Sequence, residues 1–138
     1  MNTFIDILHN GNYSCVICKG DEIHTFTQRG VADLYDLIKT NPDLLYAASV
    51  ADKVIGKAAA SLMIIGNVKE IYADIISQAA IDILSDTNIK LSYKEKIPFI
   101  QNRDQSGWCP LEKMTKEEES LDNIFTLIEN FILSMRNK

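Results

Sequence analysis

Histidine, cysteine and tryptophan are scarce in this sequence, whose 138 residues include two histidines, three cysteines and one tryptophan. The soft metal ligands available are His9, His24, Cys15, Cys18 and Cys109. Catalytic zinc needs three protein ligands and an open position. Cys15 and Cys18 fall in a predicted strand, where residues three apart point to opposite faces and do not chelate one ion. We therefore expect structural thiols, no metal site and no cofactor.

Long apolar runs are also absent. The longest, residues 54–65, is broken by Gly56, Lys57 and Ser61 and falls short of the roughly 20 residues that a membrane span requires. Residues 1–9 lack the basic start and apolar core of a secretory signal. Three thiols without such a signal indicate reduced cysteines. We expect a soluble, cytoplasmic protein with no membrane partner.

An excess of basic residues is lacking as well, because the net charge is −5. A nucleic-acid surface is normally basic, so we expect no nucleic-acid partner, although a local basic pocket is compatible with this composition. The apolar fraction of 46% and the charged fraction of 24% are ordinary for a globular protein. The length suits a single domain, residues 1–138, with one hydrophobic core.

The first forty residues predict a helix, a β-hairpin and a second helix. The first helix begins at a capping-box pair, Thr3 and Asp6, and Gly11 follows as a stop. Apolar residues in 13–18 and 23–26 flank turn-forming residues, which is typical of a hairpin. A helical stripe of Val31, Leu34 and Ile38 follows.

The middle of the chain predicts alternating helices and strands. Ser49 and Asp52 have the S-x-x-D spacing of a helix cap, and residues 54–65 are apolar on nearly all sides, so we predict a buried helix. A strand at 71–76, a helix capped by Ser77 and a strand at 89–93 follow. This order predicts an α/β fold with three layers, α/β/α, and a mixed sheet of about four to five strands.

The last part of the chain predicts one long helix. Residues 94–114 show no clear periodicity, whereas Thr115 and Glu118 have capping-box spacing. An apolar stripe from Leu121 to Met135 follows at helical spacing. We predict a C-terminal amphipathic helix over residues 115–136.

Several strings of this sequence match a known family. They are C-V-I-C-K-G-D at 15–21, Arg29-Gly30-Val31, A-D-K-V-I-G-K-A-A-A at 51–60, V-K-E-I-Y-A at 68–73, Asn102-Arg103 and Cys109-Pro110. On these residues the chain resembles the domain of unknown function 1893 family, an uncharacterised prokaryotic family of the cytidine-deaminase-like superfamily. The similarity covers roughly the first 115 residues, and it implies a cytidine-deaminase-like fold.

The same resemblance argues against zinc chemistry. True deaminases of that superfamily hold zinc through an H-x-E motif and a P-C-x-x-C motif, each of which opens a helix. The corresponding helix starts in this chain are interpreted as Ala51-Asp52-Lys53 and Ser77-Gln78-Ala79. Neither contains histidine or cysteine, so the resemblance implies the fold without the metal.

The first candidate site is the start of the predicted helix at Ser49. Open α/β sheets bind ligands at the carboxyl ends of their strands, and helix N-termini attract anions. Lys53 and Lys57, as i, i+4 neighbours, would grip a phosphate or a carboxylate. Asp52 would act as a general base or bind a ribose hydroxyl, or would only close the cap with Ser49. Lys57 has apolar neighbours and therefore has to snorkel, find a partner or face a polar cavity.

The second candidate site is the irregular segment 102–110, because long irregular loops in compact domains are often functional. Arg103 offers a planar fork for a carboxylate or phosphate, and Trp108 offers a surface on which a base stacks. Cys109 is either a nucleophile with a lowered pKa or a packed thiol before a helix-initiating Pro110.

We therefore expect a zinc-less protein that binds a small anionic or nucleotide-like ligand. The expected ligand-binding residues are Lys53, Lys57, Asn102, Arg103 and Trp108. One alternative is a metal-independent enzyme that uses Asp52 or Cys109. Another is a self-associating interaction module, and a homo-oligomer is compatible with each of these functions.

Overall fold

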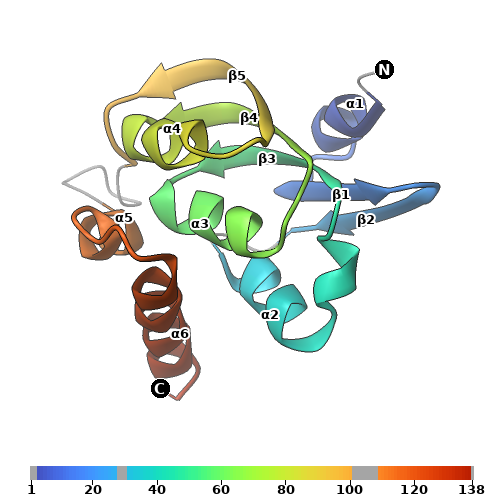
Figure 1. The fold of residues 1–138 in the computed structure, drawn as a ribbon. Coiled ribbons are helices and arrows are strands. Elements are labelled where there is room, and N and C mark those ends of the chain that lie inside the picture. The colour runs from blue at the N-terminus through green and yellow to red at the C-terminus, as the bar shows by residue number, and fades with distance from the viewer. Residues whose placement is uncertain (1–2, 28–30, 101–108, 138) are drawn as a thin grey trace.

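A computed structural model describes residues 3–27, 31–100 and 109–137, and a five-stranded sheet lies at its centre (Figure 1). The strands are β1 (Cys15–Lys19), β2 (Glu22–Phe26), β3 (Ser49–Ile55), β4 (Glu70–Ser77) and β5 (Lys90–Ile97). Their order across the sheet is β2-β1-β3-β4-β5. β1 is antiparallel to β2 and β3, whereas β3, β4 and β5 are parallel. The expected mixed sheet is confirmed.

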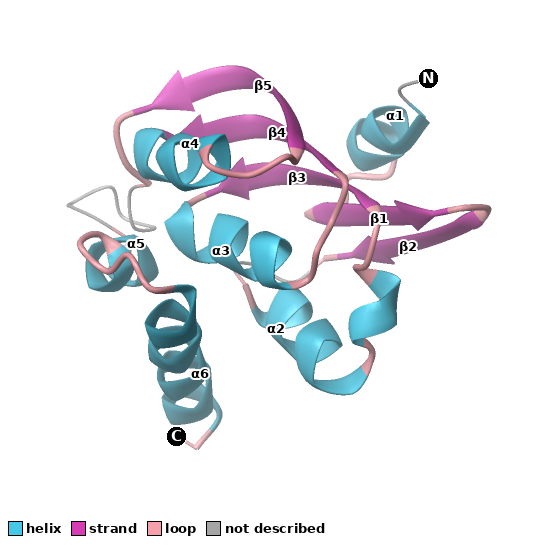
Figure 2. Ribbon diagram, in the orientation of Figure 1, coloured by secondary structure: helices cyan, strands magenta, loops and turns pink. Residues whose placement is uncertain are grey.

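Helices cover both faces of the sheet and give it three layers (Figure 2). They are α1 (Thr3–Asn10), α2 (Ala32–Thr40), α3 (Lys57–Ile65), α4 (Gln78–Ser85), α5 (Pro110–Thr115) and α6 (Leu121–Arg136), with a 3-10 turn η1 (Pro42–Leu44). α2, α3 and α4 lie on one face, and α6 packs on α3. α1 lies on the other face against β1 and β3. Among the described helices, none is long and apolar enough to cross a membrane.

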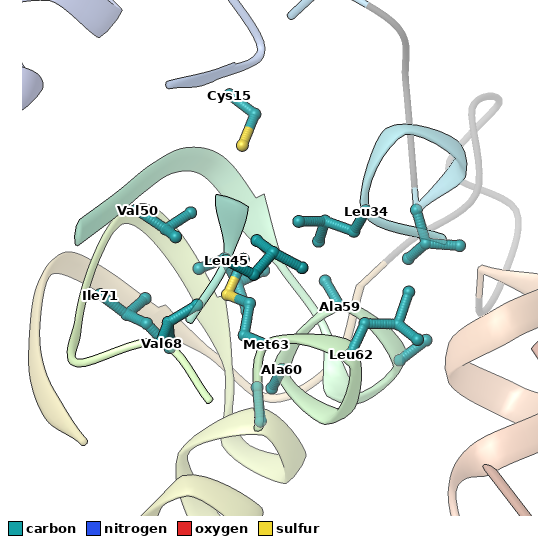
Figure 3. Packing of buried hydrophobic residues seen from close by; sticks show 14 of the residues in the cluster. Cys15, Leu34, Leu45, Val50, Ala59, Ala60, Leu62, Met63, Val68 and Ile71 are labelled. Carbon is teal, nitrogen blue, oxygen red and sulfur yellow. The ribbon is translucent and has the colours of Figure 1, made fainter. Parts of the chain in front are cut away.

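The main core lies between the sheet and the α2–α4 layer (Figure 3). Val50 in β3 and Ile71 in β4 belong to it together with Leu62 and Met63 of α3, all nearly without exposed surface. Each such side chain contributes about 1.5–3 kcal/mol relative to an exposed one. Ala51, next to Val50 in the chain, points to the α1 face instead. This alternation is the reason that one strand serves two separate cores.

Residues 49–55 form a strand, so the predicted helix start at Ser49 is wrong. Ser49 does not cap a helix, because its hydroxyl donates to Glu70 Oε1 on β4 at 2.6 Å. Asp52 is the partner of Cys15 in the β1–β3 register. Pairing on both sides of β3 satisfies its backbone groups and overrides the local cap pattern. The helix begins at Lys57, with Gly56 as its N-cap residue.

The helix predicted over 115–136 begins later than predicted, because Thr115 is the last residue of α5 and α6 spans Leu121–Arg136. Thr115 ends α5, and its hydroxyl donates to the carbonyl of Leu111 at 2.8 Å instead of capping a new helix. α6 begins at Leu121, because the Ser120 hydroxyl accepts the backbone N–H of Asn123 at 3.3 Å. The cap predicted at Ser77 is confirmed, since its hydroxyl accepts the N–H of Ala80 at 3.2 Å.

Candidate functional site

Two helices begin side by side at the carboxyl edge of the sheet. β3 passes through Gly56 into α3, and β4 ends at Ser77, the N-cap residue of α4. β3 and β4 are parallel neighbours, with Ile55 paired to Ile76, so both helix N-termini lie at one edge. Figure 1 shows α5 beside this edge, where the arrowheads of the parallel strands point. Edges of this kind are where open α/β sheets bind ligands.

A buried carboxyl group from α5 occupies this edge. Glu112 is 2% exposed. Its Oε1 accepts the backbone N–H of Lys57 at 2.9 Å and the hydroxyl of Ser77 at 3.3 Å. Its Oε2 accepts the backbone N–H of Ile100 at 3.0 Å. Gly56 supplies no side chain to cap α3, so Glu112 provides the negative charge that a helix N-terminus favours.

Gly56 allows this close approach. A Cβ atom there would lie 3.2 and 3.3 Å from the two carboxyl oxygens of Glu112 and 3.1 Å from Cγ1 of Ile100. The carboxyl group thus packs directly on the backbone of the β3–α3 junction. We call the group of Gly56, Lys57, Ser77, Ile100 and Glu112 the Glu112 notch.

The ammonium group of Lys57 points away from the notch, toward the turn between α5 and α6. Lys57 is 7% exposed. Its Nζ donates to the carbonyls of Lys116 at 3.1 Å and Glu118 at 2.5 Å. The carbonyl of Lys116, the C-cap residue of α5, has no partner within that helix, and Lys57 binds it together with the carbonyl of Glu118 in the turn. Lys57 therefore contributes its backbone N–H to the notch and its side chain to the α5–α6 turn.

Lys53 does not join Lys57 on a helix, and the predicted i, i+4 pair is wrong because Lys53 lies in β3. Its Nζ donates to Oδ1 of Asn12, next to α1, at 2.8 Å. The side chain of Lys53 thus binds a residue next to α1, whereas the side chain of Lys57 binds the turn between α5 and α6. The side chain of Lys53 lies on the face of the sheet that α1 covers.

Asp52 is buried opposite Cys15 and is not at a helix start. Its Oδ1 accepts the backbone N–H of Val54 at 3.2 Å. Burial raises the pKa of Asp52 to about 7, although hydrogen bonds from Val54, Lys53 and Cys15 lower it in part. Burial also raises the pKa of the Cys15 thiol, and the negative charge of Asp52 adds to that shift.

Cys109 is the half-buried N-cap residue of α5. Its backbone N–H donates to the carbonyl of Ile100 at 2.8 Å, so the start of α5 is bonded to the same residue whose N–H binds Glu112. Asn102, Arg103 and Trp108 lie outside the described residues. Within the described ranges, no three histidine, cysteine or acidic side chains form a group able to hold a metal ion.

Comparison with known proteins identifies the family. Residues 3–132 match the family model for TM1506, a domain of unknown function, DUF1893. The chain belongs to the DUF1893 family. A crystal structure of a DUF1893 family protein, TM1506 from Thermotoga maritima, has the same fold with a TM-score of 0.85 and 27% identity. The match covers 94% of this chain and 87% of that one. The search of curated proteins gave no match.

Glu112 is the central residue of the site in this DUF1893 chain, and the sequence patterns did not single it out. Its distinguishing signal is position, because Leu111, Glu112 and Thr115 lie on one face of α5 and all are buried. An acidic side chain on the buried face of a helix needs a partner. The partner, Lys57, lies 55 positions earlier, so only the folded chain reveals it.

A second polar cluster in the DUF1893 chain connects α1 with β4. Asp74 Oδ1 accepts the Tyr72 hydroxyl at 2.6 Å and lies 2.7 Å from Nε2 of His9. Burial and the neighbouring Asp74 raise the pKa of Tyr72 to about 12. Partial burial acts to raise the pKa of Asp74, but hydrogen bonds from Tyr72 and His9 lower it overall. His9 is largely exposed, and the cluster fastens α1 to the sheet.

Proposed function

We propose that this DUF1893 protein binds a small carboxylate- or phosphate-bearing ligand in the Glu112 notch. The observation that carries the proposal is the set of three donors around one buried carboxyl group. The N–H of Lys57, the N–H of Ile100 and the Ser77 hydroxyl all point at an acceptor. Backbone donors at a helix N-terminus are the groups that proteins use to bind anions. Glu112 shows where and how a carboxylate fits among them.

The described part of the notch favours binding over catalysis. Glu112 accepts hydrogen bonds from two backbone N–H groups and one hydroxyl group. Such donors hold an anion without transferring a proton at neutral pH. Asp52 is hydrogen-bonded within β3 and faces Cys15, and Cys109 begins α5. A metal-independent enzyme based on either residue gains no support from these contacts.

A nucleotide-like ligand fits this proposal, with its phosphate at the notch. A phosphate offers oxygens to Lys57 N–H and the Ser77 hydroxyl together, as Glu112 Oε1 does. The chain order, a helix, a hairpin and then alternating helices and parallel strands, also supports placing this family in the cytidine-deaminase-like superfamily.

The test is chemical rescue of Glu112→Ala. Loss of the carboxyl group leaves buried donors without an acceptor, at about 1–3 kcal/mol each, so the melting temperature falls. Acetate or inorganic phosphate at millimolar concentration should restore stability to Glu112→Ala more than chloride of equal ionic strength does. Differential scanning calorimetry measures the shift.

Glu119→Ala is the matched control, because Glu119 is exposed beside the same pair of helices. It should show neither the loss nor the rescue. A second variant, Glu112→Ala with Ser77→Ala, should keep less of the phosphate-dependent shift, since one donor is gone. An anion-independent melting temperature in Glu112→Ala would contradict the proposal.

A further inference from the structure

Lys57 of α3 is bonded both to α5 and to the turn that follows it. The backbone N–H of Lys57 donates to the Glu112 side chain, and the Lys57 ammonium group donates to the carbonyls of Lys116 and Glu118. Lys57 thus fastens the middle of α5 and the turn that follows it. Loss of the hydrogen bond from the Lys57 N–H to Glu112 is therefore coupled to movement of α5.

Glu112 and an external anion use the same donors. The Lys57 N–H donates to Glu112 Oε1 at 2.9 Å, and the N–H of Ile100 donates to Oε2 at 3.0 Å. Each of these N–H groups already donates to a Glu112 oxygen, so an external anion that uses them has to displace that oxygen. Binding of a ligand therefore requires the Glu112 carboxyl group to leave.

α5 is suited to leaving. It has six residues, and isolated helices of this length are marginal in water. It is held by the buried side chains of Leu111, Glu112 and Thr115 together with the Lys57 ammonium bonds. An attached competitor of this kind acts at a high effective concentration and reduces the apparent affinity for ligand in proportion to the fraction of chains in the open, binding-competent state.

We propose that α5 is an autoinhibitory segment, in which Glu112 competes with the anionic ligand for the notch and Lys57 holds the segment closed. This inference rests on the proposed function, because it concerns regulation of the same site. The ligand binds the open state, and binding releases α5 from the start of α3.

Lys57→Met separates the two roles of Lys57 in the full chain. The substitution keeps the backbone N–H of the notch and removes the ammonium bonds to Lys116 and Glu118. Isothermal titration with inorganic phosphate should show about tenfold tighter binding to Lys57→Met than to the natural chain. Lys53→Met is the matched control, since Lys53 is bound to Asn12 on the other side of β3, and its affinity should be unchanged. Unchanged or weaker binding to Lys57→Met would overturn the autoinhibitory role.

Hydrogen exchange on the natural chain gives a readout that does not depend on how a variant folds. Phosphate should raise amide exchange in residues 110–115 and leave α4 unchanged. Unchanged or slower exchange in 110–115 at saturating phosphate would overturn autoinhibition. If phosphate rescues Glu112→Ala while both of these results are negative, only autoinhibition fails. If rescue also fails, the notch itself is not an anion site.

Discussion

Asp52 is a buried aspartate whose ionised form is unfavourable in the folded protein. Its carboxyl group lies beside the Cys15 thiol, and burial raises its pKa to about 7, above the ordinary value of 3.8. The neutral form is therefore the one that the folded chain accommodates. Two of the hydrogen bonds that moderate this shift come from the β3 backbone next to it, so the acid is fixed in the centre of the sheet.

Asp52→Asn should change how stability depends on pH. The stability that the neutral Asp52 contributes is fully present below about pH 4, is lost as pH rises through the folded pKa near 7, and stays lost above it. The difference is on the order of 4 kcal/mol, from about 1.4 kcal/mol for each pKa unit. Urea denaturation at pH 5 and pH 8 should show that Asp52→Asn falls less than the natural chain.

The control for this prediction is Asp43→Asn, because Asp43 is exposed in η1. It should keep the full loss between pH 5 and pH 8. Equal losses for the natural chain and Asp52→Asn would show that Asp52 is already charged in the folded protein at pH 5.

At the scale of elements, the β3–α3 junction is the feature on which the site depends. Gly56 has an extended backbone, with φ −101°, that any residue adopts, so its role is steric. Gly56→Ala should bring Cβ to 3.2–3.3 Å from both Glu112 oxygens and lower the free energy of unfolding by about 1–3 kcal/mol. The cost should shrink when Glu112→Ala is combined with it, because most of the crowded atoms are then removed. A double-mutant cycle in urea measures this coupling, and additive costs would contradict it.

The same junction shows what the sequence could predict about elements. The β4–α4 half of the edge was predictable, because the Ser77 cap and the β-rich 71–76 segment agree. The β3–α3 half was not, since a buried strand followed by a buried helix reads as one apolar run without periodicity. Within 49–65 the break is a single residue, Gly56. The break between α5 and α6 was not predictable either, because a capping-box pattern at Thr115 precedes Ser120, the residue that caps α6.

The sequence predicted that helices begin at the carboxyl edge of the sheet, but not which side chains meet there. Helix N-termini at the carboxyl edge followed from the alternation of elements, and Lys57 was recognised as a lysine that needs a partner. Its hydrogen-bond partners are residues 112, 116 and 118. Contacts between residues so far apart in the chain cannot be predicted from local sequence patterns. Lys53 and Asp52 were assigned to the wrong element, so their expected positions were wrong too.

At the scale of the whole molecule, α6 completes the core that supports the notch. Ile124 and Ile128 have no exposed surface, and they belong to the same cluster as the α3 residues. Arg136 forms two bonds to Asp36 of α2, at 3.0 and 2.9 Å, at the far end of α6. The C-terminal helix therefore packs into the same hydrophobic core as α3.

Ile128→Ala should lower the free energy of unfolding by about 2–5 kcal/mol, because it leaves a cavity between α6 and α3. Far-ultraviolet circular dichroism and hydrogen exchange in β3 and β4 should report one shared transition. Leu133→Ala, at a site 45% exposed on the same helix, should cost much less. Loss of α6 structure before the sheet unfolds would show that the helix is an independent unit.

The separation between Lys57 and Glu112 has a consequence for the newly made chain. Chains emerge from the ribosome N-terminal end first, so the strands that form the carboxyl edge emerge before residue 112 does. During that interval the Lys57 N–H has no internal acceptor from α5. We therefore expect the start of α3 to gain its glutamate cap only after α5 has emerged and folded onto the edge of the sheet.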